Sequence, residues 1–79
     1  MSDIIETMKE SIQSALPDGV IDVQGSGGHF VIEVVSKEFA GKRIIQQHRL
    51  VLGAIAHLMK GDNAPVHAID KLTCTVPTD

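Results

Sequence analysis

A long amphipathic segment between two strand-like segments places the strongest limit on how this chain can fold. Residues 42–60 contain no proline, and their apolar positions fall in one sector of a helical wheel. The flanking residues 30–35 and 66–76 are rich in β-branched side chains, which is typical of strands. Two strands of one sheet that are joined by a helix normally run parallel, with a right-handed crossover. We therefore predict that these strands run in the same direction and, as neighbours, begin side by side.

Two further segments complete the predicted order of elements. Residues 3–16 carry apolar side chains at helical spacing and predict a short amphipathic helix. Residues 20–24 predict a strand that forms a hairpin with residues 30–35 across the glycine-rich residues 25–28. The order α-β-β-α-β predicts an α+β fold, an α/β sandwich with a three-stranded mixed sheet. A chain of 79 residues buries only about 60–65% of the surface it exposes when unfolded, so we expect one domain spanning residues 1–79.

Composition limits the compartment and the class of function. The chain has one cysteine, so no internal disulfide can form and a reducing compartment is expected. No apolar stretch approaches the roughly 18 residues of a membrane span, and the first residues lack the features of a signal peptide. We therefore expect a cytoplasmic protein with no membrane partner. A chain of this size can hardly enclose a catalytic pocket of about 300 Å³ beside its own core, so we predict that the protein is not an enzyme.

The charged residues are unevenly distributed along the chain. The net charge of −3 argues against a protein that coats nucleic acid non-specifically. Residues 39–61, however, hold four basic residues and no acidic residue. On the predicted helix 42–60 they indicate a basic face opposite the core, which is either a solvated surface or a binding surface for nucleic acid or an acidic partner. The candidate binding residues on this face are Lys42, Arg43, Arg49, His57 and Lys60.

Two histidines stand at the start of the two strands predicted to run parallel. Adjacent strands lie about 4.8 Å apart, so His29 and His67 could converge on one metal ion or cluster. Cys74 lies roughly 23 Å further along the last strand and cannot join them. Two imidazoles fill about half of a four-ligand shell, which implies that a partner completes it, and the glycines of residues 25–28 would let that partner approach. The alternative is that His29 is an exposed residue at a hairpin tip and that His67 caps a strand.

Six short motifs resemble, in order and spacing, those of the BolA-like proteins. The resemblance covers nearly the whole chain and implies an α-β-β-α-β core like that of a class II KH domain, in agreement with the order of elements predicted above. The motifs are His29-Phe30, Val34-Val35-Ser36, Phe39-x-Gly41-Lys42, Gln47-His48-Arg49-Leu50-Val51, His67-Ala68-Ile69 and Thr73-x-Thr75.

The resemblance also implies a function and a site. BolA-like proteins share a [2Fe–2S] cluster with monothiol glutaredoxins, which contribute a cysteine and bound glutathione. The BolA side is expected to supply the histidine before the last strand, which matches His67, and a residue of the hairpin loop, which matches His29. Two imidazoles on one iron have a precedent in Rieske-type centres. The implied protein is a monomer without a cofactor when alone, and it forms a heterodimer with its glutaredoxin partner.

The family is also described as DNA-binding transcriptional regulators, which provides a second hypothesis. The DNA-binding region would be helix-turn-helix-like and would lie in residues 39–60, where the basic residues are concentrated. Aromatic side chains make up only 3% of the chain, so platforms for base stacking are nearly absent. The sequence therefore favours the iron–sulfur adaptor, with DNA binding as the alternative.

Overall fold

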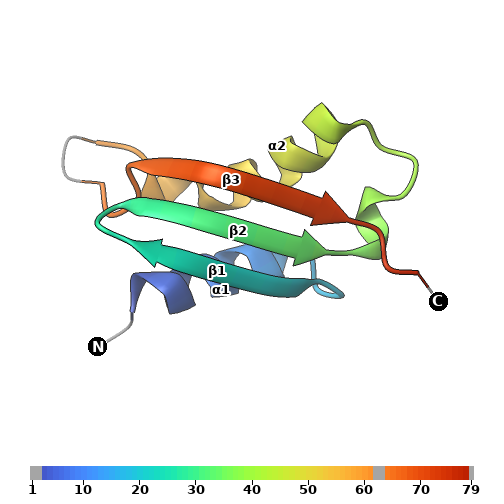
Figure 1. Cartoon of the computed structure of the whole chain (residues 1–79), viewed down its shortest axis with the longest axis horizontal. Helices are drawn as coiled ribbons and strands as arrows, with labels where there is room; N and C mark the ends of the chain where they lie inside the picture. Colours follow the sequence, from blue (N-terminus) through green and yellow to red (C-terminus); the bar gives the residue numbers. More distant parts are fainter. Residues whose placement is uncertain (1–2, 62–63, 79) are drawn as a thin grey trace.

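The computed structural model describes residues 3–61 and 64–78, and it confirms the predicted α+β fold. Figure 1 shows a three-stranded sheet with both α-helices behind one of its faces. The elements in chain order are α1 (Ile4–Ala15), β1 (Val20–Ser26), β2 (His29–Val35), the 3₁₀ turn η1 (Lys37–Phe39), α2 (Ile44–Ile55), the 3₁₀ turn η2 (Ala56–Leu58) and β3 (Ala68–Thr75).

The central strand β2 pairs with both of its neighbours. It is antiparallel to β1 and parallel to β3, so the sheet is mixed and its order is β1-β2-β3. The parallel pairing predicted from the helical crossover is therefore confirmed. In this register His29, the first residue of β2, lies opposite Ala68, the first residue of β3.

The hairpin between β1 and β2 is tighter than the sequence predicted. A four-residue connection was expected, but β1 continues to Ser26 and β2 begins at His29, which leaves only Gly27 and Gly28 in the turn. Both have positive φ, 63° and 85°, as a two-residue type I′ turn requires. Such a turn matches the twist of the flanking strands, so the two glycines allow the ladder to extend to the end of the hairpin.

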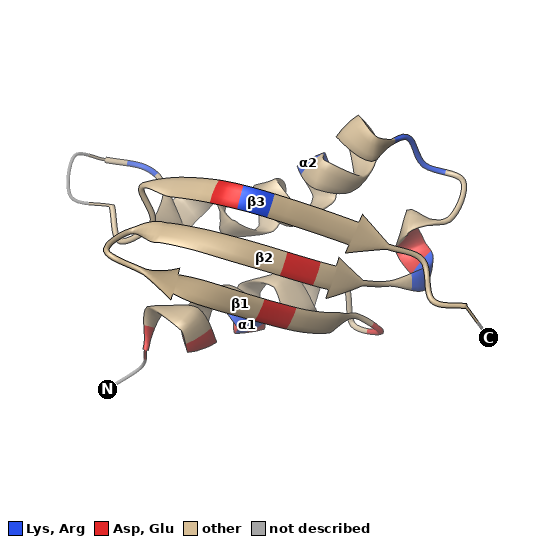
Figure 2. Cartoon of the chain, viewed as in Figure 1, with Lys and Arg blue, Asp and Glu red and all other residues tan. Residues whose placement is uncertain are grey.

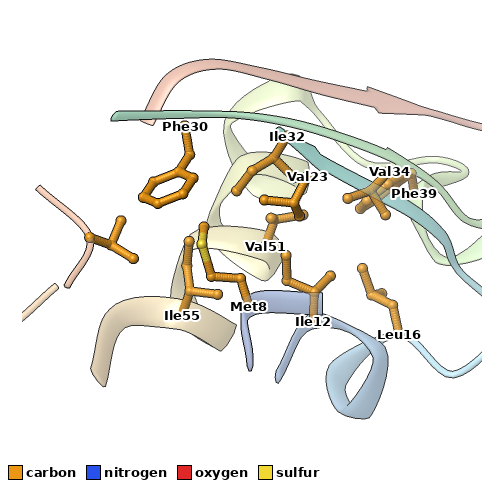
Figure 3. Close-up of a cluster of buried hydrophobic side chains, with 11 residues drawn as sticks. Met8, Ile12, Leu16, Val23, Phe30, Ile32, Val34, Phe39, Val51 and Ile55 are labelled. Atoms are coloured by element: carbon orange, nitrogen blue, oxygen red, sulfur yellow. The ribbon is translucent and has the colours of Figure 1, made fainter. Parts of the chain in front are cut away.

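The core lies between the helices and the inner face of the sheet. Alternate residues of β2 point toward the helices, as the period of two for a strand requires. Figure 3 shows them meeting side chains from α1, α2 and β1. The buried cluster is formed by Met8, Ile12, Leu16, Val23, Phe30, Ile32, Val34, Phe39, Val51, Ile55 and Val66.

The second helix is shorter than the predicted 42–60. The chain turns at Gly41, where φ is +75°, and α2 begins at Ile44 and ends at Ile55 before it tightens into η2. The predicted core face is also wrong at its start, because Ile44 and Ile45 are 70% and 57% exposed. Helical periodicity identifies a face of the helix but does not say how far along that face a packing partner extends. The residues Gly61-Asp62-Asn63-Ala64-Pro65 predict a turn after this helix, and of these Asp62 and Asn63 lie outside the described residues.

Strand β3 contains an irregularity that the sequence analysis did not predict. Phe30 pairs with Ile69, but the next residue of β2, Val31, pairs with Lys71, so Asp70 is an extra residue in the ladder. This is a β-bulge, which changes the direction of the side chains that follow it. As a result Cys74 packs against the core, and its partial burial raises the pKa of the thiol.

A buried hydroxyl links the turn after α1 to the end of β2. Ser36 is fully buried, and its Oγ donates a hydrogen bond of 2.8 Å to Oδ1 of Asp18. The backbone N–H of Lys37 donates to the second carboxylate oxygen, also at 2.8 Å. The Lys37 N–H and then the Ser36 hydroxyl hold the pKa of Asp18 below its usual value, because both hydrogen bonds favour the charged carboxylate.

Candidate metal centre

His29 stands at the beginning of β2, directly after the two-residue turn. Since Phe30 points into the core, alternation places the His29 side chain on the face of the sheet that the helices leave open. Its ring is 60% exposed, and Nδ1 lies 3.2 Å from Oδ1 of Asp70 in the bulge of β3. The ring is therefore accessible to another molecule and has one carboxylate beside it.

His67 immediately precedes β3 and is held against the hairpin. Its backbone N–H donates to the carbonyl of Gly28 at 2.8 Å, and the N–H of Ala68 donates to the same oxygen at 3.0 Å. The imidazole occupies the space beside the Gly28 Cα, since a Cβ at residue 28 would lie 2.1 Å from Cδ2 of His67. The glycines were expected to let a partner approach, but at Gly28 the close neighbour is the chain's own His67.

The two histidines lie at the same end of the sheet and are connected through Gly28. This residue is covalently linked to His29, and its carbonyl binds the backbone of His67. Both side chains are exposed. Among the described residues, no group of three or more His, Cys, Asp or Glu side chains could hold a metal ion. His29 and His67 would supply two of the four ligands of a four-coordinate centre.

Asp70 is the residue near this site that the sequence analysis missed, although the sequence contains a signal for it. In β3 the side chains packed against the core are Ile69, Leu72 and Cys74. The interval of three between residues 69 and 72 breaks the strand period of two, which indicates a bulge at one of the two polar residues between them. The pattern alone does not indicate that Asp70 turns toward His29.

The basic residues do not share one face of a helix, because only Arg49 lies within α2. Figure 1 and Figure 2 show basic segments at the start of α2 and after η2, which are at opposite ends of the molecule. Lys42 and Arg43 precede α2, whereas His57 lies in η2 and Lys60 follows it. Acidic residues lie on all three strands in the same view.

The start of α2 contains an open groove of about 390 Å³. The groove is lined by Lys42, Gln46, Arg49 and Leu50. Lys42 also donates from Nζ to the carbonyl of Glu38 at 2.6 Å, and Gln46 accepts from the N–H of Arg43 at 3.0 Å. Of the predicted binding residues, the structure therefore brings Lys42 and Arg49 together, while His57 and Lys60 are at the other end of the helix.

Comparison with known proteins identifies the family. The family model described as BolA-like protein matches residues 3–78. The chain belongs to the BolA-like protein family. The resemblance seen in the sequence motifs is thereby confirmed.

Curated BolA relatives differ from this chain in length. Protein BOLA2 from Arabidopsis thaliana is 43% identical over 51 residues, which cover 63% of this chain and 50% of that protein. BolA-like protein 1 from Homo sapiens is 39% identical over 67 residues, which cover 85% of this chain and 42% of that protein. The chain thus spans about half the length of these relatives or less.

Solved BolA structures share the whole fold described above. A bol-like protein from Babesia bovis has a TM-score of 0.75 and 32% identity, over 98% of this chain and 86% of that one. BolA1 from Arabidopsis thaliana has a TM-score of 0.81 over 98% of this chain and 95% of that one, and at 23% identity it supports the fold alone. The α+β arrangement of two helices and a mixed sheet is therefore the family fold.

Proposed function

We propose that this BolA-like protein is an iron–sulfur adaptor and trafficking protein that binds a monothiol glutaredoxin and helps to ligate a shared [2Fe–2S] cluster. The observation that carries this proposal is the pair of solvent-exposed imidazoles, His29 and His67, at one end of the sheet. Family membership supports it, because the resemblance to BolA-like proteins implies a cluster shared with a monothiol glutaredoxin. We place the protein in the cytoplasm, in accordance with its single cysteine.

The chemistry of the two side chains suits this role. A neutral imidazole binds iron through an unprotonated ring nitrogen, and two imidazoles on one iron occur in Rieske-type centres. The glutaredoxin would supply a cysteine and bound glutathione to the other iron. This division leaves the cluster at the junction of two proteins, from which it can be transferred.

Reconstitution of the heterodimer with a [2Fe–2S] cluster tests the proposal. Absorption, CD and EPR spectra would be recorded for the wild type, His67→Ala, His29→Ala and a control, His57→Ala, which removes an exposed histidine in η2. We expect changed spectra and faster loss of cluster for the two ligand variants, with the control unchanged. If His67→Ala gave the spectra of the wild type, His67 would be excluded as a ligand of the cluster and the proposal would be contradicted.

DNA binding is the second candidate function, and the groove at the start of α2 favours it. Lys42 and Arg49 line the same groove, so both cations could contact one phosphate backbone. Fluorescence anisotropy with a DNA duplex at several salt concentrations tests this function. Replacement of Lys42 or Arg49 by alanine should weaken binding and reduce the slope of log K against log salt by about 1, whereas Lys60→Ala should not. Undetectable or salt-insensitive binding would exclude it.

A further inference from the structure

We propose that Asp70 is a positioning residue for His29: it holds the proton on Nδ1 and so leaves Nε2 as the atom that binds the metal. The ligation part of this inference rests on the proposed function, whereas the proton position can be tested without any metal. The supporting contact is the 3.2 Å distance between Nδ1 of His29 and Oδ1 of Asp70, two residues that are 41 positions apart in the chain.

The chemistry of the two groups determines where the proton lies. An ionised carboxylate can only accept hydrogen bonds, so the nitrogen facing Asp70 has to be the protonated one. In a neutral imidazole one nitrogen carries the proton and the other has a free lone pair. Hydrogen bonding of His29 through Nδ1 therefore directs the lone pair of Nε2 away from Asp70. Histidine ligands of metals are commonly oriented by a carboxylate on the opposite ring nitrogen in this way.

Asp70 is the extra residue of the β-bulge, and its side chain lies on the same face of the sheet as that of His29. His29 lies opposite Ala68, and the ladder resumes regular pairing at Val31 and Lys71 only because Asp70 is inserted. Bulges occur often next to functional sites, where they change the direction of one side chain. The side chains of His29 and Asp70 are 60% and 58% exposed, so a partner can reach the ring while the carboxylate orients it.

His67 is oriented by a different contact, which separates the roles of the two ligands. Its ring packs beside Gly28, and its position is therefore determined by steric contact with the hairpin. Loss of the Asp70 carboxylate should thus alter the proton position of His29 while it leaves His67 unchanged. This gives the experiment an internal reference within the same protein.

The first experiment measures the proton position in the metal-free protein. Long-range ¹H–¹⁵N correlation spectra at about pH 8, above the usual imidazole titration, distinguish protonated from unprotonated ring nitrogens. We expect His29 to be mainly protonated at Nδ1 in the wild type and to become a mixture of both forms in Asp70→Ala. The control Asp22→Ala removes another exposed carboxylate on β1 and should leave His29 unchanged. A His29 protonated at Nε2 in the wild type, or unchanged in Asp70→Ala, would overturn the proposal.

The second experiment measures retention of the cluster in the reconstituted heterodimer. Loss of a carboxylate that orients a metal ligand typically weakens metal binding by about 10- to 100-fold, and we expect an effect of this size for Asp70→Ala but not for Asp22→Ala. Wild-type retention in Asp70→Ala, together with reduced retention in His29→Ala, would overturn the positioning role. Unchanged retention in His29→Ala would instead overturn ligation by His29, which is part of the proposed function, whatever the metal-free spectra show.

Discussion

Replacement of Gly28 by alanine would add a methyl group in the space that the His67 ring occupies. The new Cβ would lie 2.1 Å from Cδ2 and 2.9 Å from Cγ of His67, so the ring has to move. The residue also has φ +85°, where a side chain costs about 1–2 kcal/mol, partly offset by about 0.4–1 kcal/mol from the less flexible unfolded chain. Because His67 is exposed, displacement of its ring adds little to this cost, and we expect a loss of about 1 kcal/mol in the free energy of unfolding.

The neighbouring Gly27 provides a matched control. It also has positive φ, 63°, but a Cβ there would have no heavy atom within 4 Å. Urea unfolding of Gly27→Ala and Gly28→Ala should therefore give free energies within about 1 kcal/mol of each other. Only Gly28→Ala should shift the ring resonances of His67 and reduce cluster retention in the heterodimer. Identical His67 resonances in the two variants would refute the conclusion that the missing side chain at residue 28 positions this ring.

Three further predictions concern stability. The Lys37 N–H and the Ser36 hydroxyl lower the pKa of Asp18 in the folded protein. The ionised carboxylate therefore stabilises the fold above the ordinary carboxyl pKa, and this stabilisation is lost as the pH falls through the lowered pKa of the folded state. The free energies of unfolding of the wild type and Asp18→Asn, measured with urea, should thus differ at pH 7 and become equal below about pH 4. A difference that does not change with pH would contradict this. Ile12→Ala, at a fully buried position, should cost about 2–5 kcal/mol in thermal or urea unfolding. Ile44→Ser, at a 70% exposed position, should change stability by less than about 0.5 kcal/mol, and a larger loss would indicate packing around Ile44 that the structure does not show.

The parts of the fold that sequence reasoning predicted correctly are those that depend on local pattern and connection. The helix α1, the order of elements and the parallel pairing of β2 with β3 follow from periodicity and from the right-handed crossover. The errors lie at element ends. Gly27 and Gly28 form a shorter turn than residues 25–28 suggested, and α2 begins two residues late because the chain turns at Gly41.

For the candidate site, too, the sequence predicted some features correctly and others wrongly. The start of two parallel strands placed His29 and His67 at one end of the sheet, and this could be derived from the order of elements alone. The basic residues were assigned to one helical face only because the helix was extended too far, and Lys60 in fact lies at the other end from Lys42. An amphipathic pattern averages over a whole segment, so it is least informative where the segment begins and ends.

The sequence by itself determined the order of the helices and strands, and that two histidines stand at the same end of neighbouring strands. Only the tertiary structure decided what each histidine touches: His67 lies against Gly28, and His29 lies beside Asp70. These contacts join residues about 40 positions apart, and they lie next to a two-residue turn and a one-residue bulge. A shift of one residue in strand register turns every later side chain to the other face, so contacts of this kind are set by register rather than by pattern.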